Sequence, residues 1–277
     1  MADNKGQYWS MTEGVFNCLI DEERSLAFKK AIENTVSKGD IVVDMGTGSG
    51  ILALFAAKAG ASKVYAIEID KNNVKTLEKT FAENGLADVV TVIHGDVTSV
   101  VLPEKVDVVI GEMIATGLIE ELQVHAMNNV LKYTKNKFKV VLNRYETFVD
   151  LVYNNEDYYG CKFKILRYEY PDLNKLKSIE LSKKYSIDRV DFSKPRKRFM
   201  IDSELPIKIT KTGIINGIRI SGETTFFDGS KLGGTFAYDY PLILPISETN
   251  VRKGQILVVK LRYKISGGMQ KLMYSIQ

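Results

Sequence analysis

The hydrophobic pattern of this 277-residue chain changes its period about halfway along. Before residue 143, short β-branched runs alternate with longer segments in which apolar residues recur every three or four positions. Strands are expected at 41–45, 64–69, 89–94, 106–110 and 138–142, and helices at 22–37, 51–59, 72–83 and 118–131. Strands that alternate with helices favour a mostly parallel sheet with helices on both faces. The first half is therefore predicted to be a doubly wound α/β unit.

From residue 144 onward, apolar residues alternate with polar ones, as they do in half-buried strands. The alternation is longest at 144–153, 215–221 and 255–266, and Gly267-Gly268 follows the last of these as a two-residue hairpin turn would. A short helix is expected within 175–184. We predict an α/β domain over residues 1–143 and an antiparallel, β-barrel-like domain over residues 144–277.

The two halves also differ in charge, although the whole chain has a net charge of only +4. Residues 1–150 carry 16 Lys and Arg against 21 Asp and Glu, whereas residues 151–277 carry 22 against 13. A basic half could meet nucleic acid, but a solvated basic face explains the same counts. The densest basic run, 194–198, lacks the repeated aromatic residues of single-strand binding proteins.

Composition excludes several classes of protein and of site. No run approaches the roughly 18 apolar residues of a membrane span, and residues 1–8 lack the basic start and apolar stretch of a secretory signal. Cys18 and Cys161 lie far apart in no metal or redox spacing, and His94 and His125 are the only histidines. We expect a cytoplasmic protein with no membrane contact and no metal site.

The strongest local signal is a glycine-rich loop between the first strand and the next helix. Asp44 ends the strand, and Gly46, Gly48 and Gly50 follow at every second position. Glycines let a ligand approach the backbone closely, and the amides at the start of the helix face it. A dinucleotide fingerprint would need glycine where Ile51 stands. The spacing instead resembles motif I of class I S-adenosylmethionine-dependent methyltransferases. The cofactor-binding residues predicted here are Asp44, Gly46, Thr47, Gly48, Gly50 and Leu52.

Acidic residues also follow the second and third predicted strands. Glu68 ends the second strand, where the two oxygens of a carboxylate match the cis-diol of a ribose. Asp96 follows the third strand, and in this superfamily that position lies beside the adenine edge. We predict that Glu68 with Ile69, and Asp96 with Val97, contact the nucleoside of S-adenosylmethionine. A simple turn residue is the alternative for Asp96.

Two glutamates flank the segment after the fourth predicted strand. Glu112 follows the strand directly, at the edge where open α/β sheets bind ligands, and Glu121 comes nine residues later. Two carboxylates in one pocket are costly unless they hold a cation or share a proton. A planar guanidinium with five donors suits such a pair. Glu120 is expected only to interact favourably with the dipole of the helix expected at 118–131.

These motifs together resemble those of the protein arginine methyltransferases. The resemblance covers about residues 18–144 and is clearest at 21–24, 42–68 and 104–112. The β-rich half that follows resembles the barrel of the same family. The resemblance implies a Rossmann-like methyltransferase sheet that binds S-adenosyl-L-methionine.

The resemblance also implies a role for single residues. Arg24 would bind the carboxylate of the methionine moiety of the cofactor, and Glu68 would bind the ribose. Glu112 and Glu121 would be the paired glutamates that hold the substrate arginine. Tyr8-Trp9 could fold over the cofactor, as the aromatic N-terminal helix of the family does.

The chain departs from this family in its substrate loops. Met113 stands where the family has Trp, and Ala115-Thr116 stands where it has a Gly-Tyr pair. The Thr-His-Trp loop of the family is replaced around residues 238–240, and no histidine follows residue 125. Asp21 is therefore not expected to keep its partnership with that loop. The segment 153–191 is short for the dimerisation arm of the family, which leaves a homodimer as an open question.

We predict methyl transfer from S-adenosylmethionine to a nitrogen nucleophile, with the guanidine of a protein, peptide or small molecule as the favoured acceptor. Two alternatives stay open. A nucleic-acid (RNA) methyltransferase fits the basic second half, although residues 111–114 lack the Pro-Pro-aromatic signature of enzymes that methylate exocyclic amines. A non-catalytic partner protein would bind the cofactor without turnover.

Overall fold

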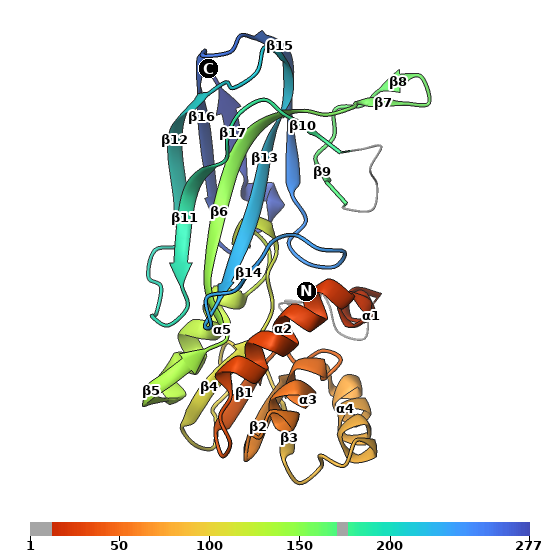
Figure 1. Cartoon of the computed structure of the whole chain (residues 1–277), viewed down its shortest axis with the longest axis vertical. Helices are drawn as coiled ribbons and strands as arrows, with labels where there is room; N and C mark the ends of the chain where they lie inside the picture. The colour runs from red at the N-terminus through yellow and green to blue at the C-terminus, as the bar shows by residue number, and fades with distance from the viewer. Residues whose placement is uncertain (1–12, 171–176) are drawn as a thin grey trace, which may run out of the picture.

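The computed structural model describes residues 13–170 and 177–277. The elements of the first half are α1 (Glu13–Ile20), α2 (Glu22–Thr35), β1 (Ile41–Met45), α3 (Ile51–Lys58), β2 (Lys63–Glu68), α4 (Lys71–Glu83), β3 (Val90–His94), β4 (Val106–Gly111), a 3₁₀ helix (Thr116–Leu118), α5 (Gln123–Val130), a second 3₁₀ helix (Leu131–Tyr133) and β5 (Thr134–Val140). Those of the second half are β6 (Leu142–Tyr153), β7 (Asp157–Tyr158), β8 (Cys161–Lys162), β9 (Arg167–Tyr168), β10 (Ile179–Glu180), β11 (Tyr185–Asp191), β12 (Met200–Lys208), β13 (Gly213–Phe226), β14 (Lys231–Leu232), β15 (Leu242–Val251), β16 (Ile256–Lys264), a 3₁₀ helix (Met269–Lys271) and β17 (Met273–Ile276). Figure 1 shows the helices and parallel strands at one end of the molecule and the antiparallel strands at the other.

Five parallel strands form the sheet of the first half, in the order β3-β2-β1-β4-β5. The register places Val43 of β1 beside Tyr65 of β2 on one side and beside Val109 of β4 on the other. Four of the five residues of β1 are buried, as expected for a strand covered on both faces. The strand order reverses between β1 and β4, so a ligand crevice is expected outside their carboxyl ends. The predicted doubly wound parallel sheet is confirmed.

The elements expected in the first half agree closely with the structure. β1 occupies its expected range, β3 and β4 differ from theirs by a single residue at one end, and β2 is shifted by one residue at both ends. Asp21 and Asp70 cap α2 and α4, because each side chain accepts a hydrogen bond from an amide of the first helical turn. β5 begins at Thr134, earlier than the expected strand at 138–142.

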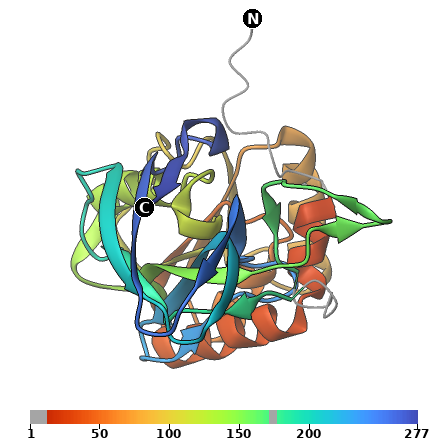
Figure 2. The ribbon, with the colours of Figure 1, turned by 90° about the horizontal axis from the view of Figure 1, so that it is seen from above.

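The second half consists of antiparallel strands, as predicted. The larger sheet has the order β10-β6-β13-β15-β9, with β11 also paired to β6 and β14 to β13. A smaller sheet has the order β12-β16-β17, and a bridge between Ser182 and Ile209 joins the two sheets. The β7–β8 hairpin projects from the rest of the chain in both ribbon views (Figures 1 and 2).

Apolar side chains from both halves pack into one core. The ring of Phe28 on α2 lies edge-on to Phe226 of β13, with centroids 4.9 Å apart, and to Tyr238, with centroids 6.1 Å apart. All three side chains are at most 1% exposed. The helix before the parallel sheet is therefore fixed against the antiparallel strands, and this contact brings the second half close to the crevice.

Some kinds of feature are absent from the described ranges, 13–170 and 177–277. No helix there combines the length and the apolar character that a membrane crossing needs. No group of three or more His, Cys, Asp and Glu side chains there is placed to hold a metal ion. Cys18 and Cys161 are both free thiols.

The helix expected over 118–131 is wrong for its first five residues. Leu118 instead has a φ of 57°, and α5 begins only at residue 123. The carbonyls of Leu118 and Ile119 accept hydrogen bonds from the amides of Ser266 and Gly268, at 2.8 and 3.0 Å. These bonds to the second half replace those of a helix, and local periodicity does not report them.

Two expectations for the second half are also wrong. Residues 179–180 form β10, because the edge of β6 offers their backbone a partner; residues 175 and 176 of the expected helix lie outside the described residues. Gly267 and Gly268 do not make a two-residue hairpin turn, since a 3₁₀ helix follows them before β17. The amide of Gly268 is already bonded to the loop after β4.

Candidate active site

The glycine loop after β1 has a conformation and packing that require glycine. Gly46, Gly48 and Gly50 have φ angles of 61°, 54° and 83°, all in the left-handed region. A Cβ atom on Gly46 would lie 2.9 Å from Sδ of Met113, and one on Gly50 would lie 2.9 Å from Cδ2 of Leu77. The loop is therefore fixed both from β4 and from α4. Leu52 follows it as a buried residue in the first turn of α3.

Asp44 is fully buried at the end of β1 and keeps one oxygen unused. Its Oδ2 accepts a hydrogen bond from Oγ1 of Thr47 at 2.5 Å, while its Oδ1 has no hydrogen-bond partner among the described residues. Burial raises the pKa of Asp44 to about 7. A cation would stabilise the ionised form of this carboxyl group. An unpaired buried acceptor beside the glycine loop therefore fits the ammonium group of S-adenosylmethionine.

Glu68 lies at the end of β2, with both oxygens turned to backbone amides. Its Oε1 accepts from the amide of Asp70 at 2.8 Å, and its Oε2 accepts from the amide of Gly48 at 3.2 Å. The side chain is buried, which fixes the carboxylate beside the glycine loop. The carbonyl of Ile69, the next residue, lies 3.1 Å from Nε2 of His94. β2 and the end of β3 are thus joined behind the expected ribose site.

Asn73 is a site residue that the sequence analysis missed. Its Nδ2 donates to the carbonyl of Gly48 at 2.7 Å and to Oε2 of Glu68 at 3.1 Å. It therefore holds the glycine loop and the acid together. A signal was present, because Asn73 precedes Leu77 and Phe81 by four and eight residues and so lies on the buried face of α4. A polar residue on that face needs a partner.

Asp96 and Val97 lie in the turn after β3. The Oδ1 atom of Asp96 accepts from the amide and the hydroxyl of Thr98, at 2.8 and 2.7 Å. The carbonyl of Val97 accepts from Nδ2 of Asn129 at 3.0 Å. Asp96 thus has the turn geometry of the alternative interpretation, and its contact with adenine stays a prediction.

Arg24 and Glu112 form a buried ion pair at the carboxyl end of β4. Nε and Nη2 of Arg24 donate to Oε2 of Glu112 at 3.0 and 2.6 Å, and the amide of Ile114 donates to Oε1 at 2.6 Å. The two side chains are only 5% and 6% exposed. Removing either one would leave a buried charge without its partner. The residue expected on the cofactor and the one expected on the substrate are therefore direct neighbours.

Glu121 has a different environment from Glu112. Its carboxylate accepts no hydrogen bond from the described residues, and its backbone carbonyl accepts from Oγ of Ser266 at 2.5 Å. Burial and then the negative charges of Glu112 and Glu120 raise the pKa of Glu121 well above its usual range. The loop after β4 therefore carries one carboxylate fixed by a cation and one that binds a proton readily.

Gln123 and Met113 connect this loop to the glycine loop, and the sequence analysis missed both contacts. Oε1 of Gln123 accepts from the amide of Met113 at 2.9 Å, and the Met113 side chain packs over Gly46. The side-chain nitrogen Nε2 of Gln123 is buried and has no hydrogen-bond partner among the described residues. The only signal for Gln123 in the sequence was its polar side chain at the start of α5.

Asp21 joins the start of α2 to the loop before β15. Its Oδ1 accepts from the amide of Arg24 at 3.0 Å, and its Oδ2 accepts from Oγ1 of Thr235 and from the amide of Ala237, the latter at 2.7 Å. The expectation that Asp21 loses its partnership with this loop is therefore wrong. A hydroxyl and an amide make the contact in place of a histidine, and they belong to Thr235 and Ala237, just before the expected position at 238–240.

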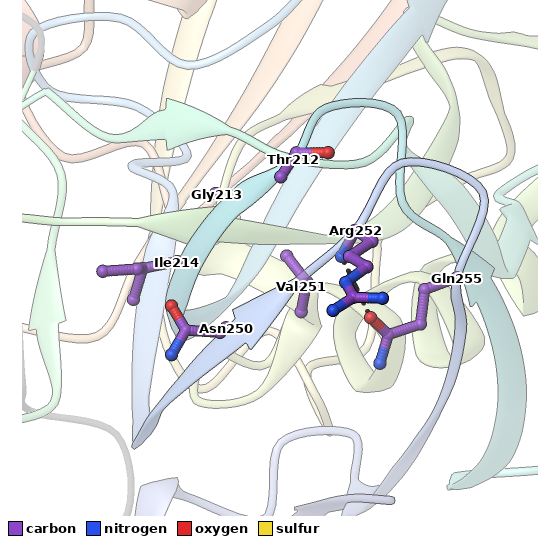
Figure 3. A pocket seen from close by; sticks show the side chains of 7 residues that line it. All are labelled: Thr212, Gly213, Ile214, Asn250, Val251, Arg252 and Gln255. Carbon is purple, nitrogen blue, oxygen red and sulfur yellow. Dashed lines mark hydrogen bonds between the residues drawn. The ribbon is translucent and has the colours of Figure 1, made fainter.

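A separate hollow of about 560 Å³ lies at the other end of β13 (Figure 3). It is lined by Thr212, Gly213, Ile214, Asn250, Val251, Arg252 and Gln255. Arg252 is its one charged lining residue, and the amide of Arg252 donates to Oε1 of Gln255 at 3.0 Å. The hollow brings no cluster of acidic residues together, so the candidate active site is the region at the carboxyl ends of β1 and β4, where Asp44 and Glu112 lie.

Comparison with known proteins agrees with this geometry. The family model of ribosomal protein L11 methyltransferase (PrmA) matches residues 26–143. An uncharacterized protein of Methanocaldococcus jannaschii is 32% identical over 259 residues, which are 93% of this chain and 94% of that protein. Protein arginine N-methyltransferase PRMT10 of Oryza sativa subsp. japonica is 44% identical over 105 residues, 37% of this chain and 27% of the rice protein.

Among solved structures, the fold is similar to that of the Trypanosoma brucei PRMT1 enzyme-prozyme heterotetrameric complex with AdoHcy. The TM-score is 0.75, at 16% identity, and the match covers 95% of this chain and 96% of that chain. The similarity therefore includes the antiparallel half as well as the parallel sheet. The first half of the chain therefore matches a class I S-adenosylmethionine-dependent methyltransferase, and the chain as a whole resembles the protein arginine methyltransferases.

Proposed function

We propose that the chain transfers a methyl group to a guanidine nitrogen. Arginine in a protein or peptide is the main acceptor, and a small molecule with a guanidine group is the alternative acceptor. The observation that carries this proposal is the pair of carboxylates on the loop after β4. Glu112 is fixed by Arg24, and Glu121 has a raised pKa beside it. A guanidinium offers donors to both carboxylates at once.

The two glutamates have different roles in this proposal. When bound, S-adenosylmethionine supplies a methyl group already activated by a sulfonium, so the protein has mainly to align the acceptor and to remove its proton. Glu112, held by Arg24 and by the amide of Ile114, orients the guanidinium. Glu121 accepts the proton that the attacking nitrogen loses as its bond to the methyl carbon forms. A raised pKa suits a carboxylate for this step.

On the cofactor side, we propose that the residues around β1, β2 and β3 bind S-adenosyl-L-methionine. The orphan Oδ1 of Asp44 and the buried carboxylate of Glu68 support this proposal. Arg24 uses Nε and Nη2 for Glu112 and Nη1 for the carbonyl of Cys18, so three of its five N–H donors are used and the other two can bind the cofactor carboxylate. The proposed set is Arg24, Asp44, Gly46, Thr47, Gly48, Gly50, Leu52, Glu68, Ile69, Asp96 and Val97. Tyr8 and Trp9 lie outside the described residues.

We also propose that residues 1–143 and 144–277 act as two domains of one cytoplasmic enzyme, the second being a barrel that covers the acceptor site. The Trypanosoma brucei relative is described as a heterotetrameric complex. For this chain, a homodimer is a separate proposal that sedimentation can test.

RNA is a weaker proposal for the acceptor, because the densest basic run is partly neutralised. Nη2 of Arg196 lies 2.8 Å from Oδ1 of Asp188, and Nζ of Lys194 lies 3.3 Å from Oδ2 of Asp191. The carbonyl of Arg196 also accepts a hydrogen bond from Nδ2 of Asn128 on α5. The run therefore joins the two halves of the chain instead of leaving all its charges free.

Transfer of labelled methyl into an arginine peptide tests the proposal. We expect transfer to the arginine peptide but not to the same peptide with lysine in its place. Glu112→Gln should lower transfer about 100-fold or more, because it removes a charge that acts on the reacting group. The affinity for AdoHcy should stay within about tenfold, or 1.4 kcal/mol.

Glu120→Gln is the matched control, because Glu120 is the exposed neighbour of Glu121 and should keep activity within about threefold. Equal loss of transfer and of AdoHcy affinity in Glu112→Gln would contradict the substrate role. Transfer into RNA but not into peptide would favour the nucleic-acid alternative, and AdoHcy binding without any transfer would favour the non-catalytic partner protein.

A further inference from the structure

A buried tyrosine and aspartate of the second half contact the loop that carries the two glutamates. The hydroxyl of Tyr145, on β6, donates to Oδ1 of Asp239 at 2.6 Å and accepts from the amide of Gly117 at 3.0 Å. Tyr145 is 0% exposed and Asp239 is 4% exposed. Gly117 lies between Glu112 and Glu121, so this chain of two hydrogen bonds ends within the acceptor loop.

Gly222 of β13 leaves the space in which this pair sits. A Cβ atom on Gly222 would lie 2.0 Å from the hydroxyl oxygen of Tyr145 and 2.4 Å from Oδ2 of Asp239. The φ angle of Gly222 is not positive, so its backbone does not itself require glycine. Glycine is required only because the pair approaches the strand so closely.

The local conformational preferences of its residues alone would not give the loop after β4 its observed shape. Its apolar spacing predicts a helix from residue 118, yet Gly117 and Leu118 have φ angles of 65° and 57°. A left-handed conformation at a leucine is unfavourable and persists only when surrounding contacts impose it. The amide of Gly117 is also buried, and without the Tyr145 hydroxyl it would lose its acceptor.

A further contact from the segment around Asp239 supports the same interpretation. Oγ1 of Thr116 donates to the carbonyl of Tyr240, the residue after Asp239. Asp239 itself has a φ of 52°, so its own backbone is in an uncommon conformation. Thr116 is thus bonded directly to Tyr240, and Gly117 is linked through Tyr145 to Asp239, the residue before it.

We propose that Tyr145 and Asp239 are positioning residues for methyl transfer, because they fix the backbone at Gly117 and thereby hold Glu121 opposite Glu112. The proposal rests on the proposed roles of the two glutamates. Neither side chain touches a reacting atom. Without the pair, the segment would extend α5 toward its N-terminus, and Glu121 would turn away from the acceptor.

Hydrogen exchange and kinetics of Tyr145→Phe together test this proposal. The variant keeps the ring and removes the hydroxyl that accepts from Gly117. We expect amide exchange in the 113–121 segment to accelerate about tenfold or more. The kcat for an arginine peptide should fall about tenfold or more, while its KM and the Kd for AdoHcy change less than about threefold.

Gly222→Ala should have the same pattern of effects, because the new methyl group displaces the pair without altering either polar group. Gly233→Ala is the matched control: a Cβ atom there meets nothing within 4 Å and its φ is not positive. Its exchange and kinetics should match those of the wild type within about twofold.

Unchanged exchange in the 113–121 segment of both Tyr145→Phe and Gly222→Ala would overturn the proposal, whatever the enzyme methylates. Faster exchange with unchanged kcat would also overturn it, since the pair would then be merely structural. If the wild type transfers no methyl to arginine, the proposed function fails, and exchange still decides whether the pair holds the loop.

Discussion

The proposed cofactor side and the proposed acceptor side of the candidate site are built in different ways. Most of the proposed cofactor side uses residues close in sequence: Asp44, the glycine loop, Glu68 and Asn73 all lie within 42–73, and only Arg24, Asp96 and Val97 lie outside that range. The acceptor side depends on distant contacts, because the loop after β4 is bonded to Tyr145, to Tyr240 and to Ser266. One side follows from local backbone rules, whereas the other exists only when the second half is folded onto it.

This difference suggests how one enzyme can keep its cofactor site while its acceptor loop varies. Changes in the second half can move Glu121 without altering the packing of Gly50 against α4. The sides are coupled through two contacts. Met113 packs over Gly46 and is held by Gln123, and Arg24 forms an ion pair with Glu112. Variants outside these two contacts should therefore leave the other side largely intact.

The largest expected effect is on the cofactor side. Gly50→Ala places a Cβ atom 2.9 Å from Leu77 and 3.0 Å from Phe81, at a φ of +83°. The loop must move, because a fully buried helix face cannot yield. We expect AdoHcy affinity, measured by calorimetry, to fall about 100-fold, or about 2.7 kcal/mol.

Gly85→Ala separates this clash from backbone strain alone. Its φ is +70°, but a Cβ atom there meets nothing within 4 Å. It should cost about 1 kcal/mol of stability and leave AdoHcy affinity unchanged. Equal losses of affinity in the two variants would mean that the loop is not specifically packed for the cofactor.

The sequence predicted the strands and the glycine loop of the proposed cofactor side well because their signals are local. Glycine spacing, an acid at a strand end and the helix periods all depend on near neighbours, and β1 occupies its expected range. The turn at Gly117 could not be found this way, since its acceptor is 28 residues distant. Asp21 kept a contact with the loop before β15 through donors that no motif specifies.

The second prediction concerns pH and the acceptor side. Burial raises the pKa of Asp239 from 3.8 to about 7, with Glu112 adding to the rise and Tyr145 and Lys184 opposing it. Between about pH 4 and 7, the folded chain therefore binds more protons at Asp239 than the unfolded chain does, and stability falls as pH rises.

Asp239→Asn should remove this loss while keeping an oxygen to which Tyr145 can donate. Urea unfolding at pH 5 and pH 8 measures this effect. Between the two pH values, the free energy of unfolding of the variant should rise by at least about 1.4 kcal/mol relative to that of the wild type. The raised pKa of Asp44 acts with the same sign but is common to both proteins. If the free energies of unfolding of the two proteins differed by the same amount at both pH values, the prediction that Asp239 binds a proton in the folded chain would be wrong.

The third prediction sharpens the cofactor side. Asn73→Ala removes the donor to Gly48 and Glu68, so the loop and the acid are no longer tied. We expect AdoHcy to bind about fivefold more weakly, or about 1 kcal/mol, with kcat little changed. Asn72→Ala, at the exposed neighbouring position, is the control and should bind AdoHcy normally. A fall in kcat alone would place Asn73 on the acceptor side.

The smallest effect is expected at Asp21, where the two sides meet. Thr235→Val removes one of three donors to Asp21 and leaves the amides of Arg24 and Ala237 in place. We expect kcat to fall about threefold and the free energy of unfolding to fall by about 1 kcal/mol. AdoHcy affinity should not change, because the cap that holds Arg24 is intact. Thr249→Val removes a hydroxyl bonded to a carbonyl at the far end of β15 and should leave kcat unchanged. If Thr235→Val instead weakened AdoHcy binding, Asp21 would transmit the state of the second half to Arg24, a third route of coupling beside Met113 and the ion pair between Arg24 and Glu112.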